Sequence, residues 1–160
     1  MLLAGGMLVS GCASLLTGAK PLEVSDSQLN WLNIRYRPAD TSRHPCRIEI
    51  IGAGYLHFMQ GASPRLADGF STDTEHAQWA NLTEEKLGMT PAETRALLQR
   101  FVDAGLLKEP ARPLNLDPDA PGIAWFRWRL NNESGACVTA KADLIGLVDA
   151  IAMHLSGQER

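Results

Sequence analysis

Apolar and polar residues alternate in several parts of the chain, and a period of two residues predicts β-strands. The pattern runs through residues 32–36, 47–51, 55–59, 123–130 and 136–140. Turn residues separate the second strand from the third at 52–54 and the fourth from the fifth at 131–135, which predicts two hairpins. Residues 78–86 are a weaker candidate for a further strand, since Trp79 and Leu82 supply most of their apolar content.

Two stretches have the spacing of amphipathic helices. Thr90-Pro91-Ala92-Glu93 is a capping box with proline at the first helical position, and Gly105 is suited to end the helix, so we predict a helix over residues 91–104. A second helix follows from the spacing of Leu144, Leu147, Val148, Ile151 and Leu155. The order of elements predicts an α+β fold, in which two helices pack on one face of an antiparallel sheet of about five strands.

The composition limits the size of the fold and the classes of partner. With 160 residues and 45% apolar content, the chain can form one hydrophobic core. Its net charge of -3 predicts neither a nucleic acid nor an anionic membrane surface as partner, because phosphate contact needs a surplus of positive charge. No apolar run reaches the length of about eighteen residues that a membrane-spanning helix requires.

The first twelve residues, MLLAGGMLVSGC, are uncharged and end in small residues and a cysteine. The segment Leu8-Val9-Ser10-Gly11-Cys12 resembles the lipobox of bacterial lipoproteins. The resemblance implies that Cys12 receives diacylglycerol on its sulfur, that a peptidase cuts after Gly11, and that an acyl chain such as palmitate modifies the new amine. Several acyl chains give stable membrane anchoring. The alternative is that residues 1–19 form a buried first helix.

This resemblance implies a domain organisation and a location. Residues 1–11 are expected to be a signal peptide, residues 12–27 a tether, and residues 28–160 one globular domain. Ala13 is not the aspartate that retains lipoproteins in the inner membrane. We therefore expect a lipid anchor in the outer membrane, with the domain facing the periplasm.

Cys46 and Cys137 are the two cysteines that lipidation leaves. In an oxidising compartment two remaining cysteines predict a disulfide, which would link the two hairpins covalently. The alternative is two unrelated buried thiols. Neither belongs to a Cys-x-x-Cys pair, and the four histidines share no spacing typical of a metal site, so we predict neither metal nor cofactor.

The strand over residues 123–130 supplies the candidate binding face. If Phe126 and Trp128 face the core, then Trp125, Arg127 and Arg129 share the opposite face. Tryptophan flanked by arginines can grip an envelope protein or a cell-wall polymer. The alternative is an ordinary strand whose outer face is covered by arginine stems. No catalytic motif is present, so a non-enzymatic binding or assembly domain is expected; the other function in view is an enzyme that acts on envelope polymers.

Overall fold

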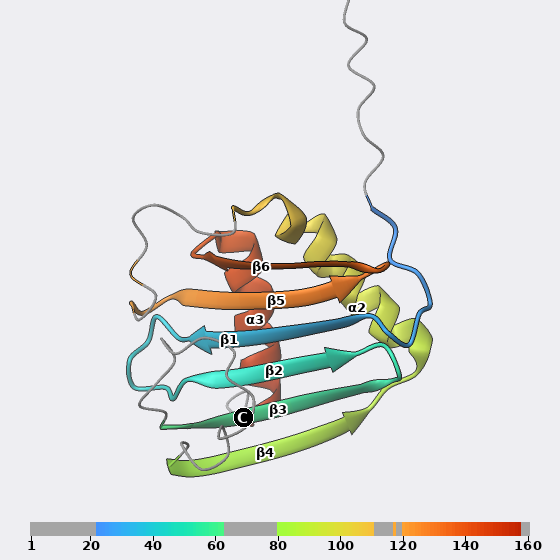
Figure 1. Cartoon of the computed structure of the whole chain (residues 1–160). Coiled ribbons are helices and arrows are strands. Elements are labelled where there is room, and N and C mark those ends of the chain that lie inside the picture. The colour runs from blue at the N-terminus through green and yellow to red at the C-terminus, as the bar shows by residue number, and fades with distance from the viewer. Residues whose placement is uncertain (1–21, 63–79, 111–116, 118–119, 158–160) are drawn as a thin grey trace, which may run out of the picture.

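A computed structural model describes residues 22–62, 80–110, 117 and 120–157. Figure 1 shows their arrangement. The strands are β1 (Trp31–Arg37), β2 (Cys46–Ile51), β3 (Tyr55–Ala62), β4 (Ala80–Gly88), β5 (Ile123–Leu130) and β6 (Glu133–Thr139). The helices are α2 (Pro91–Asp103) and α3 (Ala142–Leu155), with a short 3-10 turn, η2 (Leu106–Lys108), after α2.

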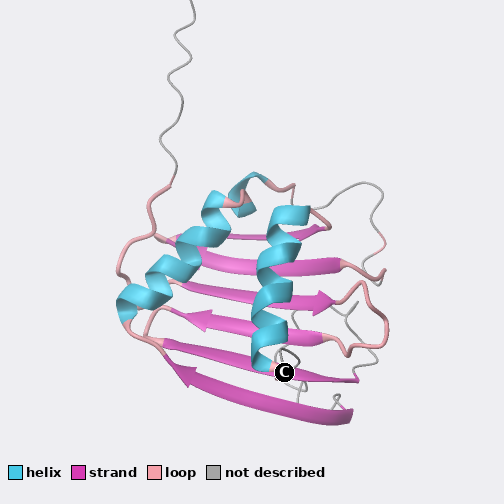
Figure 2. Ribbon diagram, turned by 180° about the vertical axis from the view of Figure 1, so that it is seen from behind, coloured by secondary structure: helices cyan, strands magenta, loops and turns pink. Residues whose placement is uncertain are grey.

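The strands form one antiparallel sheet in the order β4-β3-β2-β1-β5-β6. Both helices cross the same face of this sheet (Figure 2). The predicted α+β class is therefore confirmed, but the described residues contain six strands where about five were expected. The additional strand is β4, whose side chains from Thr83 to Gly88 are exposed at the edge of the sheet. An exposed edge strand needs no apolar alternation, so its sequence pattern is weak.

Helix α2 begins and ends as its sequence predicts. The hydroxyl of Thr90 accepts a hydrogen bond from the Glu93 amide at 3.2 Å, and the Thr90 amide donates to the Glu93 carboxylate at 2.7 Å. These hydrogen bonds from Thr90 hold the pKa of Glu93 below its usual value. At the other end Gly105 has φ +93°, a conformation that side chains other than glycine rarely adopt.

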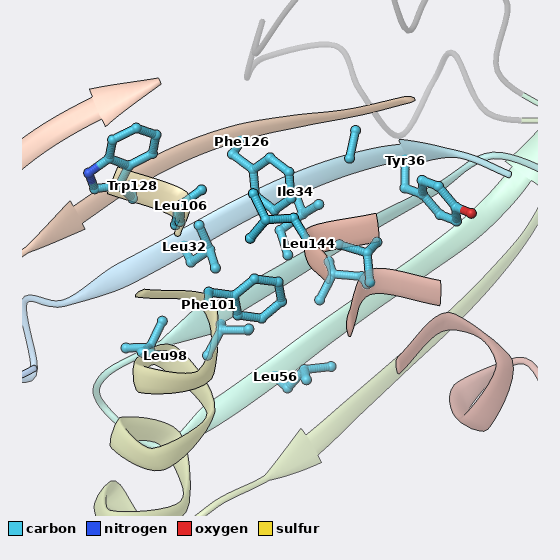
Figure 3. Close-up of a cluster of buried hydrophobic side chains, with 14 of the residues drawn as sticks. Leu32, Ile34, Tyr36, Leu56, Leu98, Phe101, Leu106, Phe126, Trp128 and Leu144 are labelled. Carbon is cyan, nitrogen blue, oxygen red and sulfur yellow. The ribbon is translucent and has the colours of Figure 1, made fainter. Parts of the chain in front are cut away.

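The core lies between the sheet and the two helices (Figure 3). Leu32 and Ile34 of β1 point toward Leu98 and Phe101 of α2 and toward Leu144 of α3. The ring of Phe126 meets Phe101 edge to face, with 6.1 Å between the ring centroids. Such aromatic pairs add about 1 kcal/mol to the stability gained by burial.

The predicted disulfide is wrong in this fold, because Cys46 and Cys137 are both free, buried thiols. Cys46 lies on β2 and Cys137 on β6, and the strands β1 and β5 run between them. Three strand spacings separate the two backbones by about 14 Å. A disulfide needs Cα atoms within about 7 Å.

The predicted boundary between tether and domain is also wrong, because the described residues from Leu22 to Ser27 belong to the folded domain. The Val24 side chain is 2% exposed and packs in the core. Its amide donates to the Gln99 side chain of α2 at 2.8 Å, and Gln99 donates to the Leu22 carbonyl at 3.0 Å. The first twenty-one residues, which hold the predicted signal peptide and Cys12, lie outside the described residues.

Candidate binding face of the sheet

Within the part of the chain that the structure describes, both helices lie on one face of the sheet (Figure 2), and we call the opposite face the open face. On β5, Phe126 and Trp128 are buried in the core, so Trp125, Arg127 and Arg129 lie on the open face. Strand register extends this face over the neighbouring strands. It brings one further set of residues of β1 onto the same face: Trp31, Asn33, Arg35 and Arg37.

An arginine stacks on a tryptophan on the open face. Arg127 is exposed, and its guanidinium lies 5.9 Å from the centroid of the Trp31 ring. Arg129 is the direct cross-strand partner of Trp31 and is half-buried. Within the described residues, no salt bridge links either arginine to a carboxylate. Two guanidinium groups beside an indole ring can therefore receive an anionic partner.

Trp125 is less accessible than its neighbours on β5. It is half-buried, and its cross-strand partner on β1 is Arg35, which is only 5% exposed. The three predicted residues thus share a face, but the exposed guanidinium of Arg127 lies at its centre rather than the indole of Trp125. Trp31 was not predicted, although its alternation with Asn33, Arg35 and Arg37 was available in the sequence.

A network of charged side chains crosses the open face from β2 to β4. The ring of His57 has Nδ1 at 3.3 Å from a Glu49 oxygen and Nε2 at 2.7 Å from a Glu84 oxygen. Glu49 also accepts from Arg47 and, at 2.8 Å, from Asn33, and Lys86 lies 3.2 Å from Glu84. The hydrogen bonds from Lys86 and His57 hold the pKa of Glu84 below its usual value.

This network limits the chemistry that the open face offers. A carboxyl group that acts as a general acid near neutral pH needs a raised pKa, which burial in apolar surroundings provides. Glu84 is instead exposed, hydrogen-bonded and held in its ionised form. The network therefore resembles a set of cross-strand ion pairs that join three strands, rather than a reactive pair of carboxylates.

The other candidate groups lie apart from this network. His44 and His154 are exposed, and His76 lies outside the described residues. Within the described part of the chain, no group of three or more His, Cys, Asp or Glu side chains could hold a metal ion. On the helix side of the sheet, a groove of about 420 Å³ lies between the C-terminal half of α3, α2 and the ends of β3 and β4, and Leu56, Leu87 and Ile151 are among its lining residues.

Comparison with known proteins adds no relative. None of the helices in the described residues is long and apolar enough to cross a membrane. No protein-family model matches the chain, and no curated protein matches it either.

Proposed function

We propose that the chain is a lipid-anchored, non-enzymatic binding domain of the bacterial envelope, held in the outer membrane through Cys12 and facing the periplasm. Two features support the proposal. The segment Leu8-Val9-Ser10-Gly11-Cys12 resembles a lipobox, and the open face carries an exposed arginine on a tryptophan. The second observation carries the binding role, because Arg127 over Trp31 has no acidic partner among the described residues.

The partner that fits this pair is an envelope protein or a cell-wall polymer with carboxylate groups. The guanidinium of Arg127 supplies charge-assisted hydrogen bonds to a carboxylate, and the Trp31 ring positions that guanidinium by stacking against it. Arginine and tryptophan are also the residues most often responsible for binding energy at protein interfaces.

The binding role is tested by Arg127→Ala in pull-down experiments from envelope extracts and with purified cell wall. The expected loss is about thirtyfold in affinity, which corresponds to a hot-spot residue. The matched control is Arg100→Ala, because Arg100 is an exposed arginine on α2, on the other side of the sheet. If Arg127→Ala binds as tightly as Arg100→Ala, the open face is not the contact surface.

The anchor is tested separately by Cys12→Ser. Without the thiol there is no site for the lipid, so the protein is expected to move from the membrane fraction to the soluble fraction. If the variant remains with the membranes, the proposed lipid anchor is wrong, whatever Arg127 does.

The alternative function is an enzyme that acts on envelope polymers. The position of His57 between Glu49 and Glu84 favours it, since imidazole and carboxylates perform acid–base catalysis. This alternative predicts that the purified protein releases soluble fragments from cell wall and that His57→Gln stops the release. A wild-type protein that binds cell wall and releases nothing supports the binding domain.

A further inference from the structure

The open face ends in a row of aromatic, apolar and basic side chains. Strand register places four residues side by side across β3, β2, β1 and β5, and we call them the end row: Tyr55, Ile51, Trp31 and Arg129. Tyr55 is 40% exposed, and Leu29, in the turn just before β1, is 59% exposed. The register continues to Gly88 at one edge and Ser134 at the other, so the row contains no acidic residue.

The N-terminal segment joins the domain at this same end of the sheet. Asn131, at the end of β5 next to the end row, accepts a hydrogen bond from the Ser25 amide at 2.9 Å and donates to the Glu23 carbonyl at 2.7 Å. Leu22 follows Cys12 by ten residues (22 − 12), and ten residues span at most about 35 Å. A lipid on Cys12 therefore keeps Leu22, where the segment joins the domain, within about 35 Å of the bilayer.

The two sides of this end differ in charge. Glu133 is the cross-strand partner of Leu130, a core residue, and therefore lies on the helix side. Asp26 lies 2.7 Å from Arg95 of α2, also on the helix side. Asp26 and Glu133 thus lie on the helix side of this end, and Arg129 lies with the aromatic residues on the open face. An anionic lipid surface attracts the second side and repels acidic groups on the first.

We infer that the end row, together with Leu29, is a membrane-docking surface for a bilayer that contains anionic lipids. Tyr55 and Trp31 have the amphipathic rings that settle at the level of lipid headgroups, and Leu29 adds apolar area. Arg129 contacts the headgroup phosphates. This inference rests on the proposed anchor, which brings the surface to the membrane. The strands then run away from the membrane surface. Arg127 lies two residues before Arg129 on β5, further from the bilayer, and stays accessible to a partner.

The experiment measures binding of the full, non-acylated chain carrying Cys12→Ser to lipid vesicles. Vesicles of phosphatidylcholine, with and without phosphatidylglycerol, are sedimented with the protein. Adding Leu29→Ser and Tyr55→Ser is expected to weaken binding about tenfold or more, because both exposed apolar contacts are lost. Arg129→Gln is expected to weaken binding about fivefold, on phosphatidylglycerol vesicles alone. Residues 1–11 are the same in every variant and contribute a constant background.

Leu87→Ser is the matched control. Leu87 is 41% exposed, close to the value for Tyr55, but its cross-strand partner Leu56 is a core residue, so it lies on the helix side. It is expected to leave vesicle binding unchanged. Thermal unfolding of each variant checks that it is folded. The inference is overturned if Leu29→Ser with Tyr55→Ser binds as tightly as the parent, or if Leu87→Ser weakens binding as much.

A second measurement uses the acylated protein on vesicles with brominated acyl chains, which quench nearby tryptophan fluorescence. Trp31→Phe is expected to remove most of the quenching, and Trp125→Phe to leave it, because Trp125 lies four residues (129 − 125) along β5 from the end row. Unchanged quenching in Trp31→Phe contradicts the inference. A failed anchor gives a different result: the Cys12→Ser protein stays with the membranes in cells, and vesicle binding by the non-acylated chain is unaffected.

Discussion

At the scale of single residues, Gly135 leaves no room for a larger side chain. A Cβ atom there would lie 2.2 Å from the Trp128 ring, which is buried in the core. We expect Gly135→Ala to lower the free energy of unfolding by about 1 to 3 kcal/mol, because the tryptophan must move. The control is Gly146→Ala in α3, where a Cβ meets nothing within 4 Å; this change should stabilise the helix by up to about 1 kcal/mol. Denaturant unfolding of both variants measures the difference.

Two buried groups at one end of the core make stability depend on alkaline pH. Burial, and then the carboxylate of Asp149, raises the pKa of Tyr36 to about 12, and burial raises the pKa of Cys46 to about 12. Both groups are neutral in the folded chain, while the unfolded chain loses these protons from about pH 9 for the thiol and about pH 10 for the phenol. Their stabilising contribution is therefore complete below about pH 9 and is lost as the pH rises toward 12.

The expected loss in the free energy of unfolding between pH 9 and 12 is on the order of 5 kcal/mol, to which both groups contribute. Unfolding by denaturant at a series of pH values measures it. Tyr36→Phe should reduce the slope between about pH 10 and 12, because one of the titrating groups is gone. A slope that is the same in the variant and in the parent would show that Tyr36 contributes nothing to it.

At the scale of elements, the cap of α2 is the feature most directly encoded in the sequence. Thr90→Ala removes the side-chain partner of the Glu93 amide and should cost about 1 kcal/mol of stability. Thr90→Ser keeps a hydroxyl at the cap and is expected to restore most of the loss. Thermal unfolding of the two variants tests this, and equal midpoints would show that the cap hydrogen bond contributes little.

Five strands and both helices could be predicted because each carries its own period. Burial on one side imposes that period on a strand, as in Ile123–Leu130, where the predicted bounds agree with the observed ones. The order of the strands could not be predicted in this way, since no local pattern indicates that β1 lies between β2 and β5. That order separates Cys46 from Cys137 and brings Glu49, His57 and Glu84 together, so the predicted disulfide was wrong and the charged network was missed.

At the scale of the whole molecule, the domain begins earlier than its hydrophobic pattern suggests. Residues 22–27 have no period, because their contacts are made mainly by backbone groups with Gln99 and Asn131, which lie far away in the sequence. The alternation that begins at Leu32 therefore marked the first strand and not the edge of the domain.

Two shortened chains test this boundary. A chain that begins at Leu22 should unfold at the same temperature as a chain with residues 1–21. A chain that begins at Gln28 should be less stable by about 2 to 4 kcal/mol, since it loses the burial of Val24 and several hydrogen bonds. Equal stability of the two shortened chains would show that residues 22–27 belong to the tether and not to the folded domain.

The central position of β1 also has a consequence for the kinetics of folding. β1 ends at Arg37 and its partner β5 begins at Ile123, so 86 positions of chain (123 − 37) must be spanned before the two strands pair. The β1–β4 meander needs only short loops, except between β3 and β4, and α2 lacks Phe126 until β5 arrives. Non-local pairing of this kind gives a high contact order, for which folding takes milliseconds to seconds. During synthesis, the hydrophobic core cannot close until the C-terminal quarter of the chain has emerged.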